Sequence, residues 1–227
     1  MNYGVIWDLD GVLAETAEAH FRCWVTALAE KEIPLDRPTF GKLFGLRNRE
    51  ILTQLVGRAP DPSEMEGIAG RIEEIFRIEA QWLVRPMPGA FSLLMELEGA
   101  GWLQAISSPT SKASVELVLG ILGIRQRFAA ILSGDELSAG KPDPTLFLRA
   151  AEALGLPPGR CVVVEDAPAG VKAAQKAGMP CIAVATTSPR EALASVTSSA
   201  LIFDDLTQVT AKDFAGLIKT NEETHPL

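Results

Sequence analysis

The order of apolar and polar residues divides the chain into two regions. Residues 3–7 form a short apolar run that stops at Asp-Leu-Asp-Gly, which predicts a buried strand followed by a loop. From Thr16, a common helix N-cap residue, apolar residues recur every three or four positions, and no strand-like stretch lies between Ala14 and Arg85. This region predicts one strand and then an all-helical block, with helices over 17–28, 40–43, 49–56 and 65–82.

The Pro-Met-Pro-Gly break at 86–89 opens a second region in which strand and helix patterns alternate. Such alternation predicts right-handed βαβ units and a parallel sheet, and the apolar runs VVV and CIAV suit strands covered on both faces. We expect strands at 102–106, 129–132, 161–164, 180–184 and 201–203, helices at 90–98, 112–122, 144–154 and 167–177, and a frayed polar tail at 221–227. The predicted fold class is α/β: a Rossmann-like three-layer core with a parallel sheet (residues 1–13 and 86–227), plus an inserted all-helical cap domain (residues 14–85).

Composition and charge narrow the possible partners. The 227 residues are 47% apolar and 22% charged, as in globular proteins that bury a core. Acidic residues outnumber basic ones by 29 to 21, a formal net charge of −8. Nucleic acids and anionic membranes bind basic surfaces, so we expect neither as a partner, whereas a local site for an anionic metabolite remains possible. The sequence has no signal-peptide pattern and no apolar run of ~18 residues, so we expect a cytoplasmic protein.

The three cysteines, Cys23, Cys161 and Cys181, are far apart and form no CxxC pair, and the chain has two histidines. This pattern excludes a zinc finger or a metal cage of Cys and His ligands. Isolated cysteines in apolar surroundings predict buried free thiols in a reducing compartment.

Chemically capable side chains follow four of the predicted strands. Because the carboxyl ends of parallel strands meet at one edge of an open α/β sheet, we expect these side chains to converge there. Carboxylates held together repel and need a cation, and oxygen ligands without nearby His or Cys favour Mg²⁺. A metal, a carboxylate nucleophile and a lysine together indicate phosphoryl transfer. The residues are Asp8 and Asp10, Ser107 and Ser108, Lys141, and Glu165 and Asp166.

The same residues carry a family resemblance. The segment 8–12, Asp-Leu-Asp-Gly-Val, resembles the DxDGx signature of the haloacid dehalogenase superfamily. Ser108, Lys141-Pro142 and Glu165-Asp166 resemble its second, third and fourth motifs, in order. The segment 164–170 is similar to the form found in the branch of β-phosphoglucomutases and small-metabolite phosphatases. The resemblance covers nearly the whole chain, including the helical insertion after the first motif.

The resemblance implies a role for each motif residue. Asp8 would attack phosphorus and form an aspartyl-phosphate, and Asp10 would act as general acid and base. Mg²⁺ would be held by Asp8, the backbone carbonyl of Asp10 and Asp166, with Glu165 bound to the ion or beside it. Ser108 and Lys141 would hold the phosphoryl oxygens, although Ser107 could take the place of Ser108. Gly11 lets the loop turn tightly beside the phosphate.

The predicted cap offers three further candidates for substrate binding. His20 matches a histidine that lies over the active site in the mutases and helps to position the acid/base Asp, but it could equally be a polar residue on a half-buried helix face. Arg47 and Arg49 occupy the loop that faces the substrate in the family. They could meet a second anionic group or be solvated surface residues.

Several functions fit this pattern, and hydrolysis of a small phosphorylated metabolite, such as a sugar phosphate, fits best. The loop around Arg47 is one residue longer than in a typical mutase, and a weakened second phosphate site favours hydrolysis. A β-phosphoglucomutase-type mutase is the alternative. Asp10 argues against a haloacid dehalogenase, and the intact set of motif residues argues against a non-catalytic binding protein. Caps of this size favour a monomer.

Overall fold

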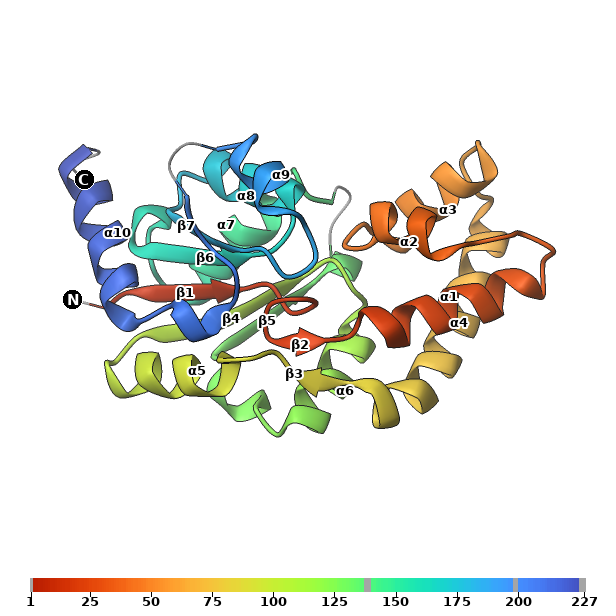
Figure 1. Ribbon diagram of the computed structural model, residues 1–227, viewed down its shortest axis with the longest axis horizontal. Helices are drawn as coiled ribbons and strands as arrows, with labels where there is room; N and C mark the ends of the chain where they lie inside the picture. Colours follow the sequence, from red (N-terminus) through yellow and green to blue (C-terminus); the bar gives the residue numbers. More distant parts are fainter. Residues whose placement is uncertain (1, 137–139, 198–199, 225–227) are drawn as a thin grey trace.

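A parallel β-sheet forms the centre of the protein. The computed structural model describes residues 2–136, 140–197 and 200–224. Within them, six strands pair in the order β5-β4-β1-β6-β7-β8, and every neighbouring pair is parallel (Figure 1). This confirms the predicted α/β class. The strands are β1 (Gly4–Trp7), β4 (Leu103–Ser108), β5 (Ala130–Ser133), β6 (Cys161–Glu165), β7 (Cys181–Val184) and β8 (Leu201–Phe203).

Helices cover both faces of this sheet. Along β6, Val162 and Val164 pack into one apolar cluster and Val163 into the other, as expected for a strand buried on both faces. The first cluster includes α5 (Ala90–Gly99), α6 (Lys112–Leu122) and α10 (Ala211–Thr224). The second includes α7 (Thr145–Ala153), α8 (Pro168–Lys176) and α9 (Arg190–Ala194). Short 3-10 helices lie at Arg125–Arg127, Gly134–Glu136, Pro158–Arg160 and Leu206–Gln208.

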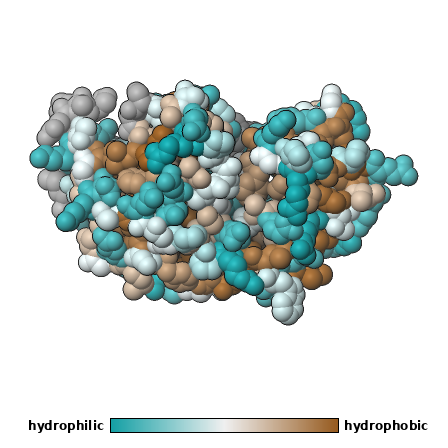
Figure 2. All heavy atoms as spheres, viewed as in Figure 1, coloured by the Kyte–Doolittle hydropathy of each residue, from teal (hydrophilic) through white to brown (hydrophobic). Residues whose placement is uncertain are grey.

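A helical insertion follows β1 and lies to one side of the sheet, at the right of Figure 1. Its longest helix presents a buried residue at every fourth position, which makes one apolar stripe along the helix. The insertion consists of α1 (Ala17–Ala29), α2 (Arg37–Leu43), α3 (Asn48–Val56) and α4 (Pro62–Leu83), and the stripe on α4 is Ile68, Ile72, Phe76 and Ala80. The molecular surface is notched between the insertion and the sheet with its helices (Figure 2).

The structure corrects the sequence interpretation at both ends of the insertion. Strand β2 (Ala14–Glu15) pairs with β3 (Arg85–Pro86) in an antiparallel ribbon, whereas the sequence pattern predicts no strand between these points. Two-residue strands are too short to show an alternating pattern. Helices α9 and α10 were also not predicted, and α10 continues to Thr224, so a frayed tail from residue 221 is wrong for 221–224. Residues 225–227 lie outside the described residues.

No helix among the described residues is both long and apolar enough to cross a membrane.

The three cysteines give a first testable expectation. All are free and buried, as predicted, and burial raises the pKa of the Cys23 and Cys161 thiols to about 12 each. Because the thiolate is the reactive form, the folded protein at pH 8 should react with Ellman's reagent far more slowly than a free thiol, and faster as the pH rises. The same protein in urea should show three reactive thiols. A thiol in the folded protein that reacts as fast as glutathione would contradict the burial.

Candidate active site

The predicted site residues meet where the strand order reverses. From β1 the chain passes to β4 and β5 on one side and later to β6, β7 and β8 on the other, so the ends of β1 and β6 flank the switch point at which open α/β sheets bind ligands. The Asp8 N–H donates to the Val164 carbonyl at 3.0 Å, which extends the pairing of these two strands into the site. Asp166 follows β6 directly.

A buried lysine links two of the carboxylates. Lys141 Nζ donates to Asp8 Oδ1 and to Glu165 Oε1, and all three side chains are almost fully buried. Burial alone would lower the pKa of Lys141, but the two adjacent carboxylates hold it above its ordinary value. The lysine therefore stays charged, with its ammonium beside Asp8.

Glu165 has a second set of partners that fixes its position. Its Oε2 accepts the backbone N–H groups of Asp166 and Ala167 at 3.0 and 3.1 Å. A Cβ on Gly170 would lie 2.0 Å from Glu165 Cδ, so glycine is required where α8 passes the carboxylate. With both oxygens bonded to the chain itself, Glu165 positions Lys141 and the loop after β6.

The remaining carboxylates fit a divalent cation. Burial raises the pKa of Asp8 well above its ordinary value, against the opposing effect of Lys141, and burial with the nearby Glu165 raises the pKa of Asp166 to about 8. Other acidic groups lie near both carboxyls and add to the effect of burial, so a bound cation would favour their ionised forms. A cavity of about 40 Å³ lies over these groups, enough for a small ion. Among the described residues no three His, Cys, Asp or Glu side chains form a ready metal cage, because Lys141 and the Thr187 hydroxyl bind the oxygens instead.

Asp10 belongs to a separate hydrogen-bond network. Its Oδ1 accepts the Thr16 hydroxyl at 2.5 Å and lies 3.4 Å from His20 Nε2, and its Oδ2 accepts the Thr110 hydroxyl at 2.8 Å. Burial favours the protonated acid, but these partners outweigh it and lower the pKa of Asp10 to about 2. Asp10 is therefore ionised in this structure. Thr16 begins α1 as predicted, but its hydroxyl bonds to Asp10 and does not cap the helix.

The two candidate serines differ in their surroundings. The Ser108 hydroxyl lies 3.5 Å from Asp10 Oδ2 and accepts the Thr110 N–H at 3.2 Å. Ser107 follows Ile106, which pairs with Trp7, so it lies in register with Asp8, and its buried hydroxyl has no hydrogen-bond partner among the described residues. Ser108 therefore lies beside Asp10, whereas no contact places the Ser107 hydroxyl at the described site residues. Which of the two holds a phosphoryl oxygen stays a prediction.

Gly11 is required by the shape of the first loop. Its φ is +82°, a region that residues with a Cβ avoid, and a Cβ there would lie 2.1 Å from Asp166 Oδ2. The Gly11 N–H donates to the Ala14 carbonyl at 2.8 Å, and its own carbonyl accepts the Thr186 hydroxyl at 2.6 Å. The glycine thus lets the loops after β1 and β6 approach closely.

We expect Gly11→Ala to lower both stability and activity. The positive φ should cost about 1–3 kcal/mol, and the added methyl group should push Asp166 away. Gly101→Ala is the matched control, because Gly101 has a φ of +80° but a Cβ added there would meet no atom within 4 Å. Chemical denaturation should show a loss of stability from backbone strain in both variants. The Mg²⁺-dependent activity should fall for Gly11→Ala alone. Full activity of Gly11→Ala would show that the close approach does not matter.

The structure brings one of the three cap candidates to the site. His20 stacks on Phe76 with ring centroids 4.4 Å apart and faces Asp10. Arg47 pairs with Glu50 at 2.9 Å. Arg49 is exposed, and neither arginine lines the cavity over Asp8 and Asp10 or the larger cavity that adjoins it. Their binding of a second anionic group stays a prediction.

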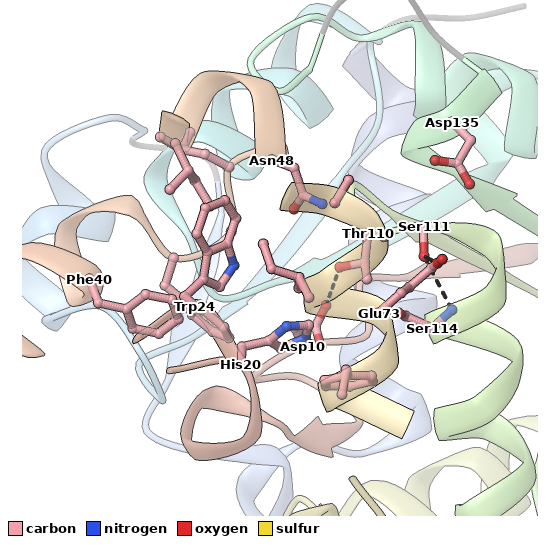
Figure 3. Close-up of a pocket in the computed structure, with 18 of the residues that line it drawn as sticks. Asp10, His20, Trp24, Phe40, Asn48, Glu73, Thr110, Ser111, Ser114 and Asp135 are labelled. Atoms are coloured by element: carbon pink, nitrogen blue, oxygen red, sulfur yellow. Dashed lines mark hydrogen bonds and ion pairs between the residues drawn. The ribbon is translucent and has the colours of Figure 1, made fainter. Parts of the chain in front are cut away.

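A larger cavity adjoins the first one. It has a volume of about 360 Å³, and Figure 3 shows Asp10 in its wall. Asp10 lines both cavities, as do Phe44, Gly45 and Leu46. The α1 and α4 helices line it from the insertion, and the start of α6 from the core. Sequence reasoning missed the hydroxyls of Thr110 and Thr187 and the cavity carboxylate of Glu73, since isolated Thr and Glu residues carry no motif.

Comparisons of the sequence with known proteins show the family to which the chain belongs. A family model described as haloacid dehalogenase-like hydrolase matches residues 5–184, most of the chain. The chain belongs to this family. It is 33% identical over 192 residues to β-phosphoglucomutase of Bacillus subtilis (strain 168), covering 82% of this chain and 84% of that protein. It is also 27% identical over 204 residues to validoxylamine A 7'-phosphate phosphatase of Streptomyces hygroscopicus subsp. limoneus, covering 90% and 94%.

A solved structure agrees with this membership. The crystal structure of CbbY from Rhodobacter sphaeroides in complex with phosphate matches this haloacid dehalogenase-family chain with a TM-score of 0.82. The sequences are 27% identical, and the match covers 92% of this chain and 96% of that one. The chain spans 20% and 57% of the lengths of two longer relatives from Arabidopsis thaliana, so the similarity to those proteins concerns only part of each.

Proposed function

We propose that this chain hydrolyses the phosphate monoester of a small metabolite, such as a sugar phosphate, through an aspartyl-phosphate on Asp8. The observation that carries the proposal is the pair of aspartates with different environments at the switch point. Asp8 lies beside the Lys141 ammonium, whereas Asp10 accepts hydrogen bonds from hydroxyls of Thr16 and Thr110. This separation gives one carboxylate the surroundings of a nucleophile and the other those of a proton carrier.

In the first step Asp8 attacks phosphorus. Lys141 holds Asp8 in place. Its ammonium also compensates the negative charge on the phosphoryl oxygens while the phosphoryl group is transferred to the Asp8 carboxylate. Asp10 faces the neighbouring cavity, where the leaving oxygen would lie, and donates the proton that this oxygen needs. Because Asp10, with a pKa of about 2, is ionised in this structure, it must first take up a proton from solvent. That uptake requires its contacts with Thr16, which precedes α1, and His20, which lies on α1, to loosen.

In the second step a water molecule attacks phosphorus and restores Asp8. Ionised Asp10 accepts the proton of that water, which is the protonation state found here. The Thr110 and Ser108 hydroxyls hold Asp10 from the core side. The same carboxylate therefore serves as acid and then as base, and the second step restores the proton that the first step uses.

Mg²⁺ fits the donor set, with Asp8, Asp166 and the backbone carbonyl of Asp10 as its proposed ligands. When bound, it would compensate the charge on the carboxylates and the phosphoryl oxygens. We further propose that the chain works as a cytoplasmic monomer on free metabolites. Its net charge of −8 favours free metabolites over nucleic acids as substrates. Sedimentation would measure its oligomeric state.

Phosphate release from a panel of phosphorylated metabolites tests the proposal. We expect Mg²⁺-dependent release from p-nitrophenyl phosphate and from at least one sugar phosphate. No release from any compound of the panel, including acetyl phosphate, would contradict it.

Similarity to the B. subtilis protein supports a mutase as the second candidate. Incubation with β-glucose 1-phosphate, Mg²⁺ and a bisphosphate primer separates the two. Hydrolysis predicts free phosphate, whereas rapid formation of glucose 6-phosphate without free phosphate would establish the mutase.

A further inference from the structure

The larger cavity is placed to receive the organic part of a phosphate ester. It meets the catalytic cavity at Asp10, so a leaving oxygen near Asp10 directs the rest of the substrate into it. Its volume of about 360 Å³ lies within the range of small-molecule sites. Much of its wall is aromatic or aliphatic, with rings from Phe44 and Phe76 and from Trp24 and Phe40, which Figure 3 labels.

The charged groups of this cavity are of one sign. Besides Asp10, the carboxylates of Glu66, Glu73 and Asp135 line it. Among the described residues, no lysine or arginine lines it, and His20 is the one basic group there. His20 already faces Asp10 at 3.4 Å. A second anionic group on a substrate would therefore meet carboxylates without a compensating cation.

Two N–H groups at the start of α6, which could otherwise bind an anion, are used by the protein itself. The Ser111 hydroxyl accepts the Ser114 N–H at 3.3 Å and donates to Glu73 Oε1 at 2.5 Å. The Lys112 N–H donates to Asp135 Oδ2 at 2.8 Å. Figure 3 shows Glu73 on α4 beside Ser111, on the side of the cavity opposite Trp24 and Phe40. Glu73 and Asp135 thus take the favourable positions for negative charge at this helix terminus.

Carboxylates among aromatic rings suit a different kind of group. Hydroxyls and ammonium groups donate hydrogen bonds to carboxylates, and ammonium groups are attracted to the faces of aromatic rings. The apolar walls suit the carbon skeleton of such a compound. A second phosphate or a carboxylate gains none of these contacts and is repelled by Glu73.

We propose that the larger cavity selects monophosphates whose organic group is uncharged or cationic, and that Glu73 is the residue that excludes a second anionic group. The proposal rests on the proposed phosphatase function and adds the class of substrate to it. The accepted esters carry hydroxyl or amino groups, and bisphosphates and phosphorylated acids are poor substrates.

Four sugar phosphates that differ in charge test the selection in the wild-type protein. They are glucosamine 6-phosphate, glucose 6-phosphate, 6-phosphogluconate and fructose 1,6-bisphosphate. We expect kcat/KM for the first two to exceed that for the last two by about tenfold or more, because like charges brought together in a binding site are strongly disfavoured. A higher kcat/KM for either of the last two would overturn the proposal.

Exchange of the charge at Glu73 tests the residue. Glu73→Lys should raise kcat/KM for fructose 1,6-bisphosphate relative to glucosamine 6-phosphate by about tenfold or more. Glu74→Lys is the matched control: Glu74 is the next residue of α4, its side chain is 65% exposed, and it pairs with Arg71. It has the same change in net charge and should leave the ratio as in the wild type. Glu73→Gln keeps an acceptor for Ser111 and provides a folded variant without the charge. An unchanged ratio in both Glu73 variants would contradict the role of Glu73.

Binding separates a failure of this proposal from a failure of the proposed function. The four compounds can be titrated by calorimetry into the Asp8→Asn variant, in which turnover is blocked. Tighter binding of 6-phosphogluconate and fructose 1,6-bisphosphate, the two compounds with a second anionic group, would overturn the cavity proposal even if the wild type hydrolyses p-nitrophenyl phosphate. Absence of phosphate release from every compound, together with tighter binding of the uncharged and cationic sugars, would contradict the phosphatase and support the cavity proposal.

Discussion

Replacement of Asp8 by asparagine is expected to reduce kcat by about 10⁴-fold or more, as losses of catalytic nucleophiles do. Asparagine has nearly the shape of aspartate but cannot form the acyl phosphate. The fold should survive, because burial already raises the pKa of Asp8 well above its ordinary value and Lys141 keeps Glu165 as a partner. The measurement is Mg²⁺-dependent hydrolysis of p-nitrophenyl phosphate, with the melting temperature measured on the same sample.

A surface substitution of the same kind provides the control. Asp204 pairs with Arg190 at 3.1 Å, and its side chain is 66% exposed. Asp204→Asn should therefore retain wild-type activity. Substantial activity of a well-folded Asp8→Asn protein would exclude Asp8 as the nucleophile.

Replacement of Lys141 by methionine is expected to affect both stability and activity. The lysine is the shared partner of two buried carboxylates, Asp8 and Glu165, and its removal leaves them without a counter-charge. Breaking a buried ion pair in this way costs about 3–5 kcal/mol. Denaturant unfolding at pH 7 measures this loss, and phosphate release should fall with it because no ammonium remains beside Asp8.

The stability lost in Lys141→Met should depend on pH, and the two buried carboxylates determine whether it grows or shrinks as the pH rises. Without the lysine, the pKa of Asp8 in the folded protein rises further above its value in the unfolded chain. The folded state then binds more protons than the unfolded state, so the free energy of unfolding falls as the pH rises. We expect Lys141→Met to lose more stability than the wild type between pH 5 and pH 8. Lys172 is exposed on α8, so Lys172→Met should follow the wild type, and the same behaviour of Lys141→Met would contradict the buried ion pairs.

Much of the core of the site could be predicted from the sequence. Asp8, Lys141 and Asp166 follow buried strands, and the rule that such strands share one edge brings them together. The strands were recognisable because burial on both faces requires unbroken apolar runs, as in β6. The presence of six parallel strands and the helical insertion followed from the same patterns.

Other features depend on long-range packing that the local sequence does not record. Helix α10 has few apolar residues, and its Phe214 packs against Trp7 and Trp102, with centroids 6.2 and 5.7 Å apart. The helix is stabilised by this contact with the sheet rather than by a strong pattern of its own. The β2–β3 ribbon likewise pairs residues that are about seventy positions apart.

The lining of the larger cavity likewise could not be predicted from the local sequence. Arg47 and Arg49 drew attention in the sequence because arginine binds phosphate, yet the structure gives Arg47 a partner in Glu50 and lines the cavity with Glu73. The charge of a binding site depends on which helix faces point into it. The sequence alone could not place α4 against the start of α6.

Chemical trapping of the covalent intermediate tests the central claim most directly. An acyl phosphate is reduced by borohydride, which would convert the phosphorylated aspartate to homoserine. The protein should be mixed with p-nitrophenyl phosphate and Mg²⁺, quenched during turnover, reduced, and cleaved after Arg22 for mass spectrometry of residues 1–22. We expect homoserine at residue 8, and none without substrate. Homoserine at Asp10 instead of Asp8, or its absence from the peptide while phosphate is released, would contradict a phosphorylated Asp8.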